Sequence, residues 1–356
     1  MHACMQLDNF RILGARSAEK SVGIEGQNEL GGNAVIEVRN LVKKYGAHLA
    51  VDHLDFTVDT GQIYGFLGPN GAGKSTTMNI MTGYLGATEG EVLINGHNIL
   101  EEPEEAKKCI GYLPEMPPLY MEMTVWEYLN FSAELKKIPK KERSIQVEQV
   151  MELVKIVDVQ NRLIKNLSKG YRQRVGLAQA ILGFPEIIIL DEPTVGLDPK
   201  QIIEIRELIR ELAKKHTVIL SSHILAEIQE VCDYIMIISH GKLVASDTPE
   251  NLEKLMSGQQ TVEIIAKGTE DVVKDVVGRI GGIKHAVYEN GIEKDAVGVS
   301  LTPEAGLDIR EQVFTEFAKS ECPLLMLSHS RTTLEDVFLE LTQGAIEEVQ
   351  TNEGDI

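Results

Sequence analysis

The stretch that decides the fold is GPNGAGKST, which comprises Gly68, Pro69, Asn70, Gly71, Ala72, Gly73, Lys74, Ser75 and Thr76. It follows an apolar run over residues 63–67 and precedes the sequence MNIM at 78–81, so a strand is expected to turn into a helix here. The pattern GxxxxGK[ST] in this context predicts a phosphate-binding loop and disfavours the alternative of a chance glycine-rich turn.

The residue types of this loop suit phosphate chemistry. Its glycines allow successive backbone N–H groups to curl around phosphate oxygens at a helix N-terminus. Lys74 would add a cation for the β- and γ-phosphates, and the Ser75 hydroxyl is placed to bind Mg²⁺. The loop therefore predicts nucleotide binding, and it leaves open what the energy is used for.

Length, charge and cysteine content narrow the class of protein. The 356 residues exceed the ~250 to 300 at which a single core stops growing, so two domains are expected. A net charge of −19 and a pI near 5.0 argue against broad contact with nucleic acid. The cysteines are scattered singly without metal-site spacing, which predicts reduced thiols; they are Cys4, Cys109, Cys232 and Cys322.

The sequence shows no membrane-spanning or export segment. No apolar run approaches the ~20 residues that cross a bilayer, and no secretory signal is visible at the N-terminus. We therefore expect a cytoplasmic protein whose attachment to the inner face of the plasma membrane is peripheral and depends on a partner.

The first two thirds of the chain alternate between strand and helix patterns. Residues 1–33 lack sustained periodicity and are expected to form a disordered N-terminal extension, whereas residues 34–256 predict a mostly parallel sheet flanked by helices. Strands are expected at 34–38, 51–58, 63–67, 90–96, 110–115, 187–190, 217–220 and 234–238. Helices are expected at 74–83, 124–137, 140–157, 169–183 with Ser168 as N-cap, 200–215 and 249–256, and another opens at Ser221, Ser222 and His223.

A new order of strands and helices begins after a linker at residues 257–260. Residues 261–330 follow the order βαββαβ of a small ferredoxin-like domain. Its strands are expected at 261–266, 284–288, 296–301 and 324–327, and its helices at 271–280 and 307–319. A short helix at 333–341 would complete an α+β accessory domain that ends at 342, and the acidic residues 343–356 are expected to be a disordered tail.

Two adjacent carboxylates follow a strand that should be fully buried. Residues 187–190 are four branched apolar side chains that stop abruptly at Asp191 and Glu192, as in a strand covered on both faces. The carboxyl ends of parallel strands are where ligands bind. Asp191 is therefore a candidate for the Mg²⁺ shell, and Glu192 is a candidate to orient and activate a water at the γ-phosphate.

Five motifs, in their order and spacing, resemble the ATP-binding cassette (ABC) family. They are residues 68–76, the sequence LSKGY at 167–171, residues 187–193, GLDP at 196–199, and Ser222 with His223. The resemblance covers roughly residues 36–256. It implies an α/β P-loop NTPase cassette with an antiparallel β subdomain and a helical subdomain at about 116–167.

In that family two cassettes meet head to tail, and each ATP lies between the loop of one and the signature of the other. The resemblance implies that Ser168 and Gly170 face the γ-phosphate bound by the opposite Lys74. It also implies that Asp198 lies at the dimer seam. A complete site would then need a second cassette, either a second copy or a paralogue.

Two residues are ambiguous from composition and acquire a role through the resemblance. Tyr45, just after the first strand, suits either adenine stacking or a strand-end gap. Without the other motifs, His223 would be interpreted as a histidine that caps a helix or packs in the core. The resemblance implies that Tyr45 stacks on adenine and that His223 is the switch histidine at the γ-phosphate.

The sequence departs from the family pattern at two places. In the signature, Lys169 and Tyr171 replace a glycine and a glutamine, while Ser168 and Gly170 are kept. Glu115, in the sequence YLPE, stands where the family has a glutamine, and its added charge would bind Mg²⁺ harder. Hydrolysis is still expected, and coupling to a partner is the property that these departures would alter.

The remaining features concern the use of the ATP. Residues 116–123, rich in Met and Pro, suit local core packing or, as the resemblance implies, a groove for a coupling helix of a membrane subunit. Residues 333–342, with YLPE and LSKGY, resemble the ATPase subunits of bacterial ABC-2 type exporters, including multidrug and gliding-motility-related ones. The resemblance therefore implies an ATPase that uses ATP and Mg²⁺ to power a separate integral membrane permease, with no nucleic-acid partner. The alternative is a non-transport ABC ATPase acting on the ribosome or DNA.

Overall fold

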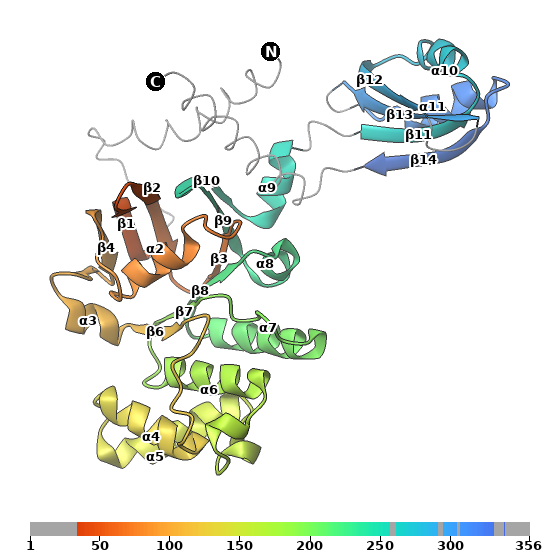
Figure 1. Ribbon diagram of the computed structural model, residues 1–356. Helices are drawn as coiled ribbons and strands as arrows, with labels where there is room; N and C mark the ends of the chain where they lie inside the picture. The colour runs from red at the N-terminus through yellow and green to blue at the C-terminus, as the bar shows by residue number, and fades with distance from the viewer. Residues whose placement is uncertain (1–33, 257–260, 291–294, 305–306, 331–337, 339–356) are drawn as a thin grey trace. The chain divides into compact units, whose positions relative to one another are not determined.

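The computed structural model describes residues 34–256, 261–290, 295–304, 307–330 and 338 (Figure 1). The expectations for residues 1–33, 257–260 and 343–356 lie outside the described residues. The same holds for the helix expected at 333–341, except that Phe338 is helical.

The nucleotide-binding loop is built onto a six-stranded sheet with the order β10-β9-β3-β8-β7-β6. The strands are β3 (Ile63–Leu67), β6 (Ile110–Leu113), β7 (Ile187–Leu190), β8 (Thr217–Ser222), β9 (Tyr234–Ser239) and β10 (Lys242–Asp247). Pairing is parallel from β9 through β6, and β10 pairs antiparallel with β9. The predicted mostly parallel sheet is confirmed, with β10 as an antiparallel edge strand that was not predicted.

Side chains of this sheet alternate between two hydrophobic cores. In β7, Ile188 and Leu190 belong to one core, whereas Ile187 and Ile189 belong to the other. Every residue of β3, β7 and β8 is buried, as expected for a parallel sheet covered on both faces. The unbroken apolar run at 187–190 is explained by this double burial.

A second, antiparallel sheet has the strand order β2-β1-β4-β5. Its strands are β1 (Ala34–Tyr45), β2 (His48–Asp59), β4 (Glu89–Ile94) and β5 (His97–Asn98). The strands β1 and β2 run further than the expected 34–38 and 51–58. Their pairing is interrupted by register shifts, and Asn40 has a φ of 47°, so the alternation that reveals a strand in sequence is broken there. Asn95 and Gly96 both have positive φ, as the predicted Asn-Gly turn requires.

Eight α-helices are described in the cassette. They are α2 (Lys74–Met81), α3 (Pro103–Lys108), α4 (Val125–Leu135), α5 (Lys140–Leu153), α6 (Lys169–Ile181), α7 (Pro199–Ala213), α8 (Leu225–Val231) and α9 (Pro249–Met256). The helix α3 was not predicted, because it has six residues and buries only Ala106. The helix expected to open at Ser221, Ser222 and His223 begins instead at Leu225, since the two buried serines complete β8. No helix in the described part of the chain is long and apolar enough to cross a membrane.

One lysine joins α4 to α6. Lys136, the C-cap of α4, donates hydrogen bonds of 2.8 Å and 2.7 Å to the carbonyl oxygens of Ala180 and Leu182 at the end of α6. Burial lowers the pKa of Lys136 to about 8. The C-terminal end of α6 is therefore fixed to α4.

The C-terminal part has its own sheet and its own core. Its elements are β11 (Thr261–Lys267), α10 (Glu270–Val277), β12 (Ile283–Asn290), β13 (Ala296–Pro303), α11 (Arg310–Ala318) and β14 (Leu324–Ser330). The sheet order is β12-β13-β11-β14 with antiparallel pairing throughout, and apolar side chains of both helices join its core. The order βαββαβ is thus the one expected, and the ferredoxin-like assignment stays a prediction.

Candidate functional site

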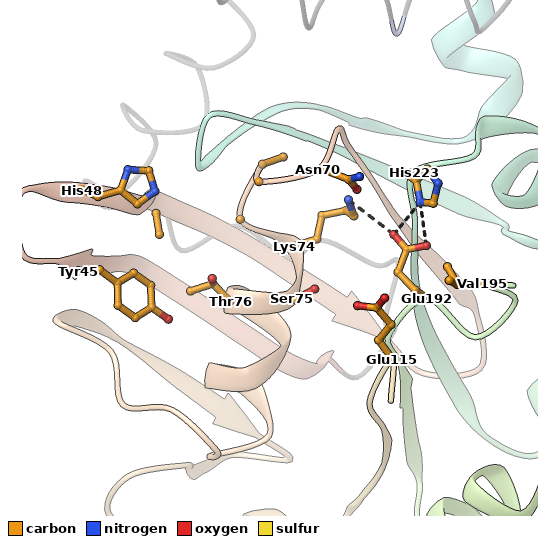
Figure 2. A pocket seen from close by; sticks show the side chains of 14 residues that line it. Tyr45, His48, Asn70, Lys74, Ser75, Thr76, Glu115, Glu192, Val195 and His223 are labelled. Atoms are coloured by element: carbon orange, nitrogen blue, oxygen red, sulfur yellow. Dashed lines mark hydrogen bonds and ion pairs between the residues drawn. The ribbon is translucent and has the colours of Figure 1, made fainter. Parts of the chain in front are cut away.

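A pocket of about 420 Å³ lies around the loop that precedes α2 (Figure 2). Its walls come from the antiparallel sheet, the loop, the segment after β6, and the ends of β7 and β8. The lining residues are Tyr45, His48, Ala50, Asn70, Gly71, Ala72, Gly73, Lys74, Ser75, Thr76, Glu115, Glu192, Val195 and His223. Most of the residues predicted for nucleotide binding thus share one cavity.

The loop needs glycine for both conformation and close approach. Gly71 and Gly73 have φ values of 83° and 106°, which side chains with a Cβ rarely adopt. A Cβ at Gly73 would lie 2.6 Å from the carbonyl oxygen of Ala50, and one at Gly68 would collide with the backbone of Ile238. Gly68 and Pro69 do not line the pocket; they act through their carbonyl groups, which hold Lys74.

Lys74 places a buried cation at the pocket wall. Its Nζ donates to the carbonyl oxygens of Gly68 at 2.7 Å and Pro69 at 3.2 Å, and lies 3.8 Å from Oε1 of Glu192. Burial lowers the pKa of Lys74, and the nearby carboxylates of Glu192 and Asp191 oppose that shift. The ammonium is thus already desolvated and paired with the carboxylate predicted to activate water.

Glu192 and His223 point toward each other in the pocket, as Figure 2 shows. His223 Nδ1 lies 3.0 Å from Oε2 and 3.2 Å from Oε1 of Glu192. Glu192 also has a φ of 47°, an uncommon value for a residue with a long side chain. Strained backbone of this kind persists only where the surroundings hold it, and it clusters at functional sites.

A serine that the sequence reasoning missed holds both carboxylate residues in place. Ser221, at the end of β8, is fully buried. Its hydroxyl accepts a hydrogen bond of 2.9 Å from the backbone N–H of Glu192 and donates one of 2.6 Å to Oδ1 of Asp191. The only sequence signal was its position at the carboxyl end of a buried strand, beside His223.

The residues predicted for Mg²⁺ are partly brought together. Ser75 Oγ donates to Asp191 Oδ1 at 3.2 Å, so the hydroxyl and the carboxylate share one location. Asp191 lies behind the pocket lining, while Glu115 is part of it. Within the described ranges, no cluster of three or more His, Cys, Asp or Glu side chains is arranged to hold a metal.

Tyr45 offers an exposed ring at the other end of the pocket. It is the last residue of β1, is 48% exposed, and pairs with His48 across a two-residue turn. The Nζ of Lys43 lies 5.3 Å from the ring centroid. His48 was not predicted, because the strand that carries it was expected to begin at residue 51.

The signature residues form a second group outside this pocket. Ser168 caps α6 and its hydroxyl accepts a hydrogen bond of 3.4 Å from the backbone N–H of Tyr171, so the predicted N-cap is confirmed. Asp198 caps α7, where it accepts a bond of 3.0 Å from the N–H of Gln201. A Cβ at Gly170 would lie 2.7 Å from side-chain atoms of Gln201, so the start of α6 packs closely against the first turn of α7.

The two substituted signature side chains make contacts of their own. The ammonium of Lys169 lies against Gly196, in the loop before α7, so that a Cβ at Gly196 would overlap it. The hydroxyl of Tyr171 donates a hydrogen bond of 3.0 Å to Asp158. The departures from the family pattern therefore tie the signature to neighbouring segments of the same chain.

Comparisons with known proteins agree with this geometry. The family model described as ABC transporter matches residues 51–195. The chain is 34% identical to the bacitracin transport ATP-binding protein BcrA of Bacillus licheniformis, over 88% of this chain and 98% of that protein. It is 42% identical to the uncharacterized ABC transporter ATP-binding protein YhcH of Bacillus subtilis (strain 168), over 59% of this chain and 68% of that protein. Among solved structures, the ATP-binding subunit of an ABC transporter aligns with a TM-score of 0.57 and 31% identity, covering 62% of this chain and 92% of the other.

Proposed function

Because the chain belongs to the ATP-binding proteins of ABC transporters, we propose that it hydrolyses ATP as one half of a head-to-tail pair of cassettes and powers a separate membrane permease. ATP binding and ATPase activity belong to the family. The proposal concerns how the residues of this chain share the reaction and what the reaction drives.

One observation carries the proposal: the predicted residues fall into two groups within one chain. The loop, Glu192 and His223 line one pocket. Ser168 and Gly170 lie outside it, at the N-terminus of α6. A helix N-terminus attracts anions, so the signature suits the phosphates of a nucleotide held by another copy or a paralogue.

Within the pocket, each group has a task that its chemistry suits. Lys74 would stabilise the β- and γ-phosphates, and the loop N–H groups would hold their oxygens. Glu192 would orient and deprotonate the attacking water, with His223 setting the position of its carboxylate. The exposed ring of Tyr45 would stack on the base, and His48 borders the same end.

The oxygen donors beside the loop fit Mg²⁺. Ser75 and Asp191 supply a hydroxyl and a carboxylate, in hydrogen-bond contact at 3.2 Å. So few protein ligands suit an ion that keeps several waters and takes its remaining ligands from phosphate. When bound, the ion would neutralise charge on the phosphate oxygens; Glu115, on the pocket wall, would add negative charge near it.

The partner we propose is an integral membrane permease, at the inner face of the plasma membrane. Large apolar side chains before α4 are exposed: Met116 at 84%, Tyr120 at 55% and Met121 at 40%. Neighbouring Met123 and Trp126 pack against the core and hold the segment in place. Flexible Met side chains suit an apolar helix of a permease, and this surface supports the proposed docking.

Export is the direction that we propose. One support is the likeness of residues 333–342, YLPE and LSKGY to ABC-2 type exporters. The other is the similarity to BcrA, a protein named for bacitracin transport; the matched region covers 88% of this chain and so includes much of its C-terminal part. The alternative of an ATPase acting on the ribosome or DNA is not supported by these relatives, which are named for transport.

The variant Glu192→Gln tests the reaction. It should retain ATP binding, slow hydrolysis by ~10² to 10⁴, and accumulate an ATP-bound dimer in size-exclusion chromatography with light scattering. A monomeric variant with normal turnover would contradict the mechanism. Stimulation of ATPase activity by ribosomes or DNA, and not by a co-purified membrane protein, would contradict the transport role.

A further inference from the structure

A buried glutamate outside the pocket lining has no role in the function proposed above. Glu227, in α8, is 6% exposed and does not line the pocket. Its Oε2 accepts a hydrogen bond of 2.6 Å from the hydroxyl of Thr194 and one of 3.1 Å from that of Ser222. No ion pair is found for it among the residues that the structure describes.

The two hydroxyl donors sit beside the two residues predicted to act on the γ-phosphate. Thr194 follows Glu192 by two positions, in a turn closed by a bond of 3.2 Å from the Val195 N–H to the Glu192 carbonyl. Ser222 immediately precedes His223, and its hydroxyl also accepts a bond of 3.0 Å from the Ile224 N–H. A single carboxylate oxygen thus joins the loop after β7 to the turn after β8.

The hydroxyl groups of Thr194 and Ser222 are both buried, so their hydrogen bonds to Glu227 are costly to break. Thr194 is 5% exposed and Ser222 is fully buried. A buried hydroxyl that loses its partner finds no water to replace it, so the full desolvation cost of the group remains. Because a misplacement of about 1 Å can slow a reaction ~10²-fold, a bond network that fixes both loops bears directly on catalysis.

We propose that Glu227 is a positioning residue for ATP hydrolysis, which holds Glu192 and His223 in register by binding the hydroxyls beside them. The proposal rests on the roles proposed above for those two residues. Glu227 does not line the pocket, and it acts through Thr194 and Ser222.

Replacing Glu227 should separate turnover from binding. Glu227→Ala should lower kcat ~30-fold or more, with the KM for ATP and the affinity for a fluorescent ATP analogue changed less than ~3-fold. Glu227→Gln should recover most of the kcat, because one amide oxygen has two lone pairs and can accept both hydroxyl bonds. A purely structural role would lower kcat only in proportion to the folded fraction.

A milder variant covers the case in which Glu227→Ala does not fold. Thr194→Val keeps the shape of the side chain and removes one of the two bonds, so kcat should fall ~5- to 10-fold with little change in melting temperature. The matched control is Glu230→Gln on the same helix. The Glu230 side chain is 59% exposed and pairs with Arg206, so its loss should leave kcat unchanged.

The outcomes separate this inference from the proposed function. If Glu192→Gln slows hydrolysis as expected while folded Thr194→Val keeps kcat within twofold of the unmodified protein, and Glu227→Ala either does the same or fails to fold, the positioning role is wrong and the function stands. If Glu192→Gln itself hydrolyses ATP normally, the proposed function fails first. If kcat falls in Thr194→Val and the KM is preserved, Glu227 positions the site.

Discussion

The hydroxyl of Ser221 donates a 2.6 Å hydrogen bond to Asp191 and at the same time accepts one from the backbone N–H of Glu192. The end of β8 thereby fixes the end of β7, where the two adjacent carboxylates lie. Both bonds are made between groups of the chain itself, and together they set the positions of Asp191 and Glu192.

Ser221→Ala should destabilise the fold. It leaves the N–H of Glu192 without its buried acceptor, at a residue with strained φ, and should cost ~1 to 3 kcal/mol of unfolding free energy. Urea denaturation of the variant and the unmodified protein measures this loss of unfolding free energy. The control is Ser239→Ala, because the buried Ser239 Oγ has no hydrogen-bond partner among the described residues, so its removal should be neutral or slightly stabilising. Equal losses for the two variants would contradict the proposed difference.

His223→Ala should mainly affect turnover. Without the imidazole 3.0 Å from Glu192, the carboxylate loses one of its two charged or polar neighbours in the pocket and keeps Lys74, so its position is less well fixed and kcat should fall ~10²-fold. ATP binding, which depends on the loop and Lys74, should change far less. Steady-state ATPase assays with nucleotide titration separate the two effects. His97, a partly exposed histidine outside the pocket lining that pairs with Glu102, gives the control His97→Ala, which should keep full activity.

Tyr45→Ala should weaken nucleotide binding with little effect on the chemical step. Loss of a base-stacking ring costs ~1 to 3 kcal/mol, equivalent to a roughly 5- to 150-fold rise in the Kd for ATP, while Tyr45→Phe should preserve it. Isothermal titration calorimetry measures the change. Tyr84, which is 83% exposed and absent from the pocket lining, provides the control Tyr84→Ala. An unchanged Kd for Tyr45→Ala would show that the ring does not contact the base.

Lys136 should give the fold a specific dependence on pH. Because burial lowers its pKa to about 8, whereas an unfolded lysine titrates near 10.5, the folded state binds fewer protons between these values. Stability contributed by this group should therefore rise as the pH increases from about 8 to 10.5, by roughly 3 kcal/mol at most. A neutral amine still has two N–H groups for the carbonyls of Ala180 and Leu182.

The comparison with Lys136→Met isolates this effect. Between about pH 8 and 10.5, the unfolding free energy of the unmodified protein should rise relative to that of the variant. A difference that stays constant from pH 7 to pH 10 would show that Lys136 keeps an ordinary pKa.

Features set by local backbone requirements were predictable from the sequence. The loop from Gly68 to Thr76, the buried run at 187–190 and the N-cap at Ser168 each depend on residues close together in the chain. These patterns located the two ends of the site and the order of the main elements.

What the sequence could not predict depends on contacts between distant segments. Ser221 and Glu227 act through partners about 30 positions away, and a lone serine or helical glutamate carries no local sign of that. The half-exposed β10 and the six-residue α3 were missed for a different reason, since neither buries enough apolar surface to produce a periodic pattern.

The two bonds from Lys136 have a mechanical consequence. They clamp the far end of α6 to α4, while Ser168 caps the near end about 20 Å away along a 13-residue helix. A push on the surface before α4 would therefore move α6 as one stiff unit, and the force would reach the contacts of its first turn, where Lys169 lies against Gly196 and Gly170 packs against Gln201.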